Sequence, residues 1–317
     1  MTRKYLALTG GVGGAKLSVG LSHVLGPDEL AFVVNTGDDF EHFGLHIAPD
    51  LDTLTYALAR LSNAETGWGR AGESWNFIAA MRELGSEDWF NLGDKDLALH
   101  VSRTARLRRG ETLTQVTRDL SAALGIRHAI WPMSDAPVRT VVETPHGPLA
   151  FQHYFVRERC VPAVTGFHFA GATEATLNPG ALAWLRDPAL AGVIICPSNP
   201  FVSIDPILAL PGLRKGLSEL AVPVVAVSPI VAGLALKGPT AKMMQELAMP
   251  TTALAVASHY QGLLDGFIVD HQDRALLDQC ADSEFAAIAT QTVMLTLNDK
   301  IELARTTLQF LDILTPR

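Results

Sequence analysis

Residues 6–16 read LALTGGVGGAK, and this stretch decides the class of fold. Leu6 to Thr9 is a short apolar run that stops at glycines. From Ala15 to Leu25 the apolar residues recur with helical spacing until Gly26-Pro27 ends the pattern. The stretch therefore predicts a strand, a loop and a helix. Glycines let backbone N–H groups approach phosphate oxygens, and a helix N-terminus adds positive potential. Phosphate binding and a tight strand-to-helix turn are both open interpretations of the loop.

The glycine-rich loop matches neither of two familiar nucleotide-binding motifs. A P-loop ends in Gly-Lys followed by Ser or Thr, whereas this chain has Ala15-Lys16-Leu17. The dinucleotide fingerprint needs a third Gly or Ala at position 16, where Lys16 stands. We still expect the loop to meet a nucleotide phosphate, through Gly10, Gly11, Gly13, Gly14 and Lys16.

Three further apolar runs are typical of strands that are covered on both faces. They are Leu30–Val34, Gly192–Cys196 and Pro223–Val227, and each ends in a polar turn. Residues 52–100 and 299–314 have mainly helical spacing, the former interrupted by loops at 67–73 and 93–96. This alternation predicts an α/β fold with a Rossmann-like, mostly parallel sheet and helices on both faces. Ligands of such sheets bind beyond the carboxyl ends of the strands, so the polar turns should line one rim.

A change of hydrophobic period marks a smaller unit within the chain. Val138–Glu143 and Leu149–Phe155 are β-like and flank Pro145-His146-Gly147, a hairpin signal. We expect residues 1–317 to form a single α/β domain. Within it, a smaller α+β subdomain with β-strands should occupy approximately residues 130–180.

Composition and charge exclude several classes of protein. The chain has 317 residues, of which 48% are hydrophobic and 18% charged, as is typical of a globular protein. Its net charge of −8 comes without a basic block, so we expect no nucleic acid partner. Charges, Gly or Pro break the apolar runs before bilayer length, and the N-terminal apolar stretch is too short for a signal peptide. We therefore expect no membrane contact and a cytoplasmic location.

Four carboxylates follow the second predicted strand within a short segment. Asp38 and Asp39 are adjacent, and such a pair is costly in repulsion unless a cation or a basic group compensates it. Asp50 and Asp52 follow Pro49, which is a good helix start, so capping and metal binding are both open for Asp50 and capping is favoured for Asp52. Carboxylates with spare coordination positions suit Mg²⁺ bound to a diphosphate. The predicted metal ligands are Asp38, Asp39, Asp50 and Asp52.

Other polar residues have two interpretations each. Ser198-Asn199-Pro200 with Ser203 offers hydroxyl and amide groups suited to a base, ribose or phosphate, but ordinary turns use the same residues. Lys95, between two carboxylates, offers a cation to a phosphate or carbonyl, or else lies in a solvated loop before a helix. His42 and His46 are four residues apart, but Gly44 between them weakens a helical metal site. We expect both histidines at the surface or behind the site.

Seven motifs stand in order along nearly the whole chain, and each alone is weak. They are Thr9-Gly10-Gly11-Val12-Gly13-Gly14-Ala15-Lys16, Val34-Asn35-Thr36-Gly37-Asp38-Asp39, Pro49-Asp50-Leu51-Asp52-Thr53, Leu92-Gly93-Asp94-Lys95-Asp96, Pro132-Met133-Ser134-Asp135, Pro197-Ser198-Asn199-Pro200 and Ser228-Pro229-Ile230. Together they are specific, and the chain resembles the 2-phospho-L-lactate transferases of coenzyme F-420 biosynthesis, the CofD family. The loop Gly67-Trp68-Gly69 is similar as well.

The resemblance implies a magnesium-dependent transferase. Members of this family take a guanylyl-activated small acid phosphate, such as lactyl-2-diphospho-5′-guanosine. They transfer the phospho-acid to the terminal ribityl hydroxyl of the deazaflavin Fo and release GMP. The sequence leaves 2-phospholactate, phosphoenolpyruvate and 3-phosphoglycerate open as the acid, because pocket shape separates them. A homodimer is the expected assembly.

The resemblance also implies roles for single residues. Asp50, Thr53 and Lys95 are similar to the deazaflavin contacts, and Lys95 stands where some relatives have arginine, which keeps the charge but changes the donor geometry. The implied catalytic residues are Asp38, Asp39 and Asp50. The residues that would meet the guanosine diphosphate part are Ser198, Asn199, Pro200, Ser203 and Ser228.

Two other functions stay open on the sequence. Gluconeogenesis-factor-like regulatory proteins bind a nucleotide sugar without transferring it, and they share the glycine-rich start and the strand-end asparagine and aspartate. The segments at 49–52 and 93–96 resemble the transferases more closely. A nicotinamide dehydrogenase would use Asp38 on a ribose, but the broken fingerprint disfavours it.

Overall fold

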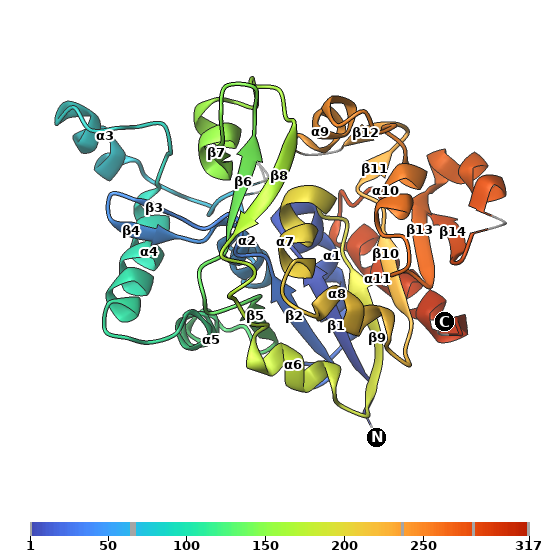
Figure 1. Cartoon of the computed structure of the whole chain (residues 1–317). Coiled ribbons are helices and arrows are strands. Elements are labelled where there is room, and N and C mark those ends of the chain that lie inside the picture. The colour runs from blue at the N-terminus through green and yellow to red at the C-terminus, as the bar shows by residue number, and fades with distance from the viewer. Residues whose placement is uncertain (1, 64–67, 236–237, 281–282, 316–317) are drawn as a thin grey trace.

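The central sheet confirms the α/β prediction. The computed structural model describes residues 2–63, 68–235, 238–280 and 283–315. Seven parallel strands form one sheet with β1 near its middle, and chain order reverses between β1 and β9 (Figure 1). That reversal is a topological switch point, where ligands of such sheets bind. In spatial order the strands are β14 (Ala286–Thr290), β13 (Gly266–Asp270), β10 (Val224–Val227), β9 (Leu190–Ile195), β1 (Lys4–Thr9), β2 (Leu30–Val34) and β5 (Ala129–Pro132).

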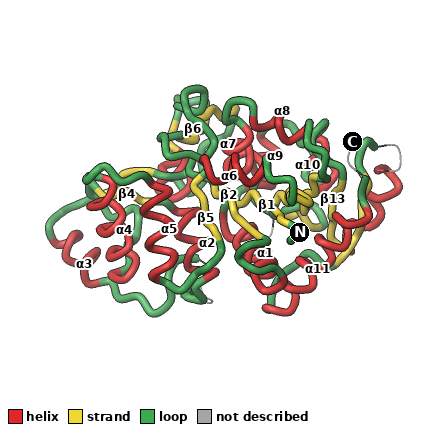
Figure 2. The backbone as a smooth tube through the Cα atoms, turned by 90° about the horizontal axis from the view of Figure 1, so that it is seen from below, coloured by secondary structure: helices red, strands yellow, loops and turns green. Residues whose placement is uncertain are grey.

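Helices cover both faces of this sheet, as Figure 2 shows. Alternate residues of β1 enter the two cores, Leu6 and Leu8 on one face and Tyr5 and Ala7 on the other. Burial of both faces explains why these strands are continuous apolar runs. One layer contains α1 (Gly11–Val24), α2 (Pro49–Leu58) and α11 (Leu297–Ile313). The other contains α6 (Pro179–Leu185), the π-helix η2 (Pro200–Ile204), α7 (Asp205–Leu208), α8 (Leu213–Ser218), α9 (Thr240–Glu246) and α10 (Ala253–His259).

A helical lobe lies beyond the β2–β5 side of the sheet (Figure 1). Its strands pair antiparallel as a hairpin, and α4 packs on β4 while α5 packs on β5. The elements are β3 (Phe40–His42), β4 (Leu45–Ile47), α3 (Asn76–Glu83), α4 (Asp94–Leu107) and α5 (Leu113–Ala123). Three short elements follow strands of the central sheet. They are β11 (Ile230–Val231) and β12 (Leu234–Ala235), which come after β10, and the 3₁₀ segment η3 (His271–Cys280), which comes after β13.

A small antiparallel sheet falls inside the range 130–180. It contains β6 (Arg139–Glu143), β7 (Leu149–Ala150) and β8 (Gly166–Ala170), with β6 in the middle. Val142 pairs with Leu149, which confirms the hairpin. The strand expected to continue to Phe155 is wrong beyond Ala150, because a π-helix, η1 (His153–Arg157), follows. Phe151 and Tyr154 are buried three residues apart, a helical rather than a strand spacing. The division of the chain into one domain with a subdomain stays a prediction.

The predicted boundaries elsewhere differ by a few residues. β2 has the predicted bounds, whereas α1 begins at Gly11 instead of Ala15. Gly67, the first residue of the loop expected at 67–73, lies outside the described residues. In the part of the chain that the structure describes, no helix has both the length and the apolarity needed to cross a membrane.

Candidate active site

The glycine-rich segment is a tight turn that continues directly into a helix. β1 ends at Thr9, Gly10 is extended, and α1 begins at Gly11. Gly11 has a φ of +62°, in the left-handed region that favours glycine. The low helix propensity of glycine is the reason that the sequence predicts a longer loop here. Tertiary packing overrides that propensity.

The later glycines of the segment allow close packing against the chain after β9. A Cβ on Gly13 would collide with the carbonyl oxygen of Pro197, and one on Gly14 would collide with the hydroxyl of Ser198. Ser198 Oγ also donates to Gly10 O at 2.8 Å and accepts from Gly10 N at 3.1 Å. The rim expected from the sequence therefore exists, since segments 188 residues apart meet at the switch point. Contact of these glycines with phosphate stays a prediction.

The other residues expected at the nucleotide make hydrogen bonds within the protein, and those of Asn199 and Ser228 are local. Asn199 Oδ1 accepts from Phe201 N at 2.9 Å, and Ser228 Oγ accepts from Ile230 N at 3.1 Å. These are turn bonds, as the second interpretation of the motifs expects. Lys16 Nζ donates to Met294 O at 2.9 Å. The remaining nucleotide residues lie in η2, where Pro200 and Ser203 are buried.

Asn35, directly after β2, gathers the predicted catalytic carboxylates. Its Nδ2 donates to Asp38 Oδ1 at 3.0 Å and to Asp50 Oδ2 at 2.9 Å. The same nitrogen donates to Val202 O at 3.1 Å, and Asn35 Oδ1 accepts from Gly37 N at 2.8 Å. One buried amide thus holds two carboxylates at the carboxyl edge of the sheet.

Asp50 does not cap its own helix. α2 begins at Pro49 with Ala48 as its N-cap residue, and no side chain caps it. The helix start expected at Pro49 is confirmed, but the capping interpretation is wrong for Asp50 and also for Asp52, which bonds to Arg103. Asp50 Oδ1 instead accepts from Gly11 N at 2.7 Å, at the N-terminus of α1, where negative charge is favourable.

Asp38, Asp39 and Asp50 are all buried at this edge. Burial, together with the charges of Asp50 and Asp39, holds the pKa of Asp38 well above its usual range in spite of the Asn35 hydrogen bond. Burial also raises the pKa of Asp50 to about 6, against the hydrogen bonds from Asn35 and Gly11. We name Asp38, Asp39 and Asp50 the catalytic cluster, after the role that the sequence predicts for them.

The carboxylate oxygens of the catalytic cluster are chemically suited to a hard divalent cation. Asp39 is 2% exposed; its Oδ2 lies 3.0 Å from His46 Nε2, whereas its Oδ1 has no hydrogen-bond partner among the described residues. Carboxylate oxygens are the ligands that Mg²⁺ prefers, and a bound cation would relieve the repulsion that raises the pKa values. Among the described residues, however, the one group of three His, Cys, Asp or Glu side chains whose ligand atoms all lie within 4.8 Å of one another is Asp52, Asp96 and His100. Binding of Mg²⁺ by Asp38, Asp39 and Asp50 therefore stays a prediction.

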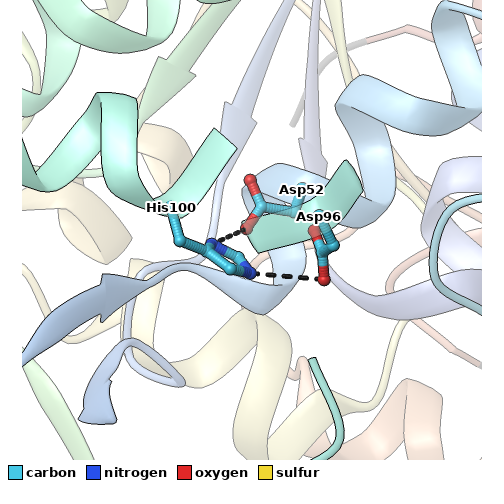
Figure 3. A group of neighbouring side chains, drawn as sticks. All are labelled: Asp52, Asp96 and His100. Carbon is cyan, nitrogen blue, oxygen red and sulfur yellow. Dashed lines mark ion pairs between the residues drawn. The ribbon is translucent and has the colours of Figure 1, made fainter. Parts of the chain in front are cut away.

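Asp52 belongs to a second group of charged side chains, two residues further along α2. Ligand atoms of Asp52, Asp96 and His100 lie within 4.8 Å of one another, so this group could also hold a metal ion (Figure 3). His100 lies between the two carboxylates, with Nδ1 3.6 Å from Asp52 Oδ2 and Nε2 3.2 Å from Asp96 Oδ2. The sequence interpretation missed Asp96 and His100 as members of such a group.

This second group already contains a cation, Arg103. Both terminal nitrogens of its buried guanidinium bond to Asp52, and Nη1 lies 3.1 Å from Asp52 Oδ2. Burial raises the pKa of Asp52 against the opposing charge of Arg103. Burial also acts to raise the pKa of Asp96, but the interactions with His100 and the hydrogen bond from Tyr56 keep it below the ordinary value. We name Asp52, Asp96, His100 and Arg103 the paired cluster. A metal role for Asp52 stays a prediction.

The paired cluster supports the catalytic cluster through β4. Arg103 Nη1 donates to His46 O at 3.3 Å, and His46 N donates to Thr104 Oγ1 at 2.8 Å. Side chains of α4 therefore hold the backbone N–H and the carbonyl of His46, and the imidazole of His46 contacts Asp39. Lys95 is exposed in the first turn of α4, where the sequence allowed a loop before the helix, and Thr53 is half-buried on α2. The same two helices thus carry both the paired cluster and the predicted deazaflavin contacts.

Asn35 was not predicted as a site residue, and His46 was expected only at the surface or behind the site, whereas its imidazole contacts Asp39. Asn35 could have been found, because it immediately follows a buried strand on the rim that binds ligands. His46 and Arg103 carry no such signal, since their partners are set by a hairpin and a helix that meet only in the folded chain.

A doubly wound parallel sheet with buried carboxylates at its switch point defines a Rossmann-like α/β protein with a polar ligand site. The family model described as 2-phospho-L-lactate transferase CofD matches residues 6–304. The chain therefore belongs to the CofD family, transferases of coenzyme F-420 biosynthesis, and the resemblance of its motifs is confirmed.

Relatives with two different names resemble this chain about equally. A 2-phospho-L-lactate transferase of Methanosarcina mazei is 37% identical over 306 residues, which cover 96% of this chain and 99% of that protein. A phosphoenolpyruvate transferase of Kitasatospora aureofaciens is 38% identical over 315 residues, covering 96% and 97%. A solved structure from Bacillus halodurans, of a UPF0052 family member, has a TM-score of 0.61 at 13% identity and covers 97% of this chain and 99% of that one. At that identity the likeness concerns the fold alone.

Proposed function

We propose that this protein is a magnesium-dependent transferase that moves a phospho-acid from its guanosine diphosphate-activated form to the terminal ribityl hydroxyl of Fo and releases GMP. Membership of the CofD family supports the reaction class. The observation that carries the proposal is the catalytic cluster: one amide, Asn35, holds Asp38 and Asp50 beside a buried Asp39 oxygen that has no partner among the described residues.

The chemistry requires one bond to form and one to break. The ribityl oxygen attacks the phosphorus that carries the acid, the bond from that phosphorus to the GMP oxygen breaks, and the hydroxyl proton must be accepted. Asp50, at the N-terminus of α1, is the proposed acceptor of that proton. Asp38, Asp39 and Asp50 are the proposed residues that would hold Mg²⁺, which would supply charge neutralisation for the diphosphate and the leaving GMP. Asn35 holds Asp38 and Asp50 in place, so these carboxylates are already positioned before a substrate binds.

The two substrates are expected on different sides of the catalytic cluster. Thr53 and Lys95, on α2 and α4, are proposed contacts of the deazaflavin, and the α1 N-terminus together with the turn at Ser198 is the proposed place for the nucleotide. The acid of the donor stays open as a class of three, because relatives of nearly equal identity carry names of different acids. A homodimer in the cytoplasm remains the proposed setting.

The test is GMP release from guanylylated 2-phospholactate, phosphoenolpyruvate or 3-phosphoglycerate, each incubated with Fo and Mg²⁺. We expect one acid to give fast release, with the coupled product seen by mass spectrometry, and chelation of Mg²⁺ to stop it. The alternative, a regulator that binds a nucleotide sugar, predicts a thermal shift with UDP-sugars and no GMP release from any donor. That result would remove the transferase proposal. Light scattering of the same preparation measures the assembly.

A further inference from the structure

A small cleft adjoins the catalytic cluster at Asp39. Its volume is about 210 Å³, below the roughly 300 Å³ at which pockets for whole drug-sized ligands begin. Its polar lining consists of Thr36, Asp39, His46, Asp135 and Arg139. A cleft of this size holds one small group of a substrate rather than a nucleoside or a deazaflavin ring system.

Arg139, the first residue of β6, supplies the only guanidinium of that lining. The side chain is half-buried, and its Nη1 donates to two backbone carbonyls, Val138 O at 2.7 Å and Thr36 O at 3.4 Å. Within residues 2–63, 68–235, 238–280 and 283–315, no carboxylate lies within ion-pair distance of it, in contrast to Arg103. A guanidinium without an acidic partner presents a planar fork that matches a carboxylate or phosphate.

Two residues of the lining each have a buried oxygen without a hydrogen-bond partner among the described residues. Thr36 Oγ1 and Asp39 Oδ1 belong to side chains that are 2% exposed, and neither has a hydrogen-bond partner among the described residues. Buried polar atoms are nearly always paired, so such exceptions indicate a missing partner. The Thr36 hydroxyl can donate to an anion, whereas Asp39 needs a donor or a cation. The pair therefore suits an anionic group that arrives together with the divalent cation of the proposed function.

We propose that this cleft binds the carboxylate of the donor's phospho-acid and that Arg139 is the specificity-determining residue for it. The inference rests on the proposed function. The diphosphate would lie at the cation, and the guanosine is too large for the cleft, so the carboxylate is the remaining charged group of the donor. All three acids carry a carboxylate. Arg139 would therefore select phospho-acids over phospho-alcohols and amides, and it would not choose among the three acids.

The experiment compares two donors that differ only in this group, guanylylated 2-phospholactate and its carboxamide. For Arg139→Gln we expect kcat/KM to fall about 30- to 100-fold with the carboxylate donor, because a charge-assisted hydrogen bond is lost. With the carboxamide donor the change should stay within about threefold. Arg139→Lys keeps the charge but loses the planar fork of the guanidinium. Its kcat/KM with the carboxylate donor should therefore lie between that of the parent and that of Arg139→Gln.

Two further measurements make the outcome independent of turnover and of folding. Calorimetry of free 2-phospholactate with Mg²⁺ should show weaker binding to Arg139→Gln than to the parent. Arg118→Gln is the matched control: Arg118 is 69% exposed on α5 and pairs with Asp119, so its removal should change neither readout.

Equal losses on both donors would place Arg139 at the diphosphate and overturn the proposal, as would unchanged kinetics and binding in Arg139→Gln. Absence of GMP release from the parent with every donor would instead remove the proposed function. Calorimetry would then still decide whether Arg139 binds a carboxylate.

Discussion

Asp50 and Asp52 stand two residues apart on α2, yet they belong to clusters of opposite character. Asp50 shares one amide with Asp38, and no Lys or Arg pairs with these carboxylates among the described residues. Asp52 forms a two-point ion pair with the buried guanidinium of Arg103. An uncompensated buried carboxylate is costly, and a site that binds a cation uses that cost. Among the described residues the catalytic cluster therefore has no Lys or Arg partner, whereas the paired cluster contains Arg103.

The largest expected effect is that of Asp50→Asn on turnover. The amide would keep an acceptor for Gly11 N, but it cannot accept the hydroxyl proton or carry the charge that Mg²⁺ needs. We expect kcat to fall about 10²- to 10⁴-fold while the folded state is retained. Steady-state GMP release and a thermal melt measure both quantities. Equal rates for variant and parent would remove Asp50 from the mechanism.

The next effect tests the paired cluster. Arg103→Met leaves Asp52 buried without a cation and should lower the free energy of unfolding by about 3–5 kcal/mol. The double variant Asp52→Asn/Arg103→Met removes both charges and should recover at least half of that loss. Arg106→Met breaks a more exposed ion pair on the same helix and should cost about 1 kcal/mol or less.

Urea denaturation of these three variants measures the free energies. If Arg103→Met cost no more than Arg106→Met, the paired cluster would have no special role in stability, and the contrast between the two clusters would fail.

The smallest expected effect is a pH dependence of stability without Mg²⁺. The pKa of Asp50 is about 6 in the folded protein and near 3.8 in the unfolded chain, so unfolding releases its proton within that window. Below about pH 4, Asp50 therefore leaves the free energy of unfolding unchanged. As pH rises to about 6 it lowers this free energy increasingly, and above that pH the lowering stays constant. The expected fall is about 2–3 kcal/mol.

Denaturation of the parent and of Asp50→Asn from pH 4 to 7.5 measures the contribution of Asp50 together with the change in Asp38, whose pKa the charge of Asp50 also raises. Added Mg²⁺ should stabilise the parent more at pH 7.5 than at pH 5. A difference between parent and variant that does not change with pH would contradict the raised pKa.

Much of the fold could be predicted from local pattern. β2 is a continuous apolar run between a helix stop and a polar turn, and its bounds were predicted without error. The pattern of apolar runs that end in polar turns also predicted that Asp38, Asp50 and the turn at Gly10 share one rim, because the carboxyl ends of parallel strands lie on one edge of the sheet. Asp50 as a helix cap was wrong, since its carboxylate turns to the neighbouring helix.

The sequence by itself determined the class of fold, the family and the edge on which the polar residues gather. The hydrophobic period and the turn-forming residues act over a few neighbouring positions, so they can be recognised in the sequence itself. Only the tertiary structure decided which carboxylate is compensated: Arg103 reaches Asp52 across 51 positions, and Asn35 joins Asp38 to Asp50. It also left Arg139 without an acidic partner among the described residues. The charge state of a buried group depends on partners that packing brings together, and packing is not readable from neighbours in sequence.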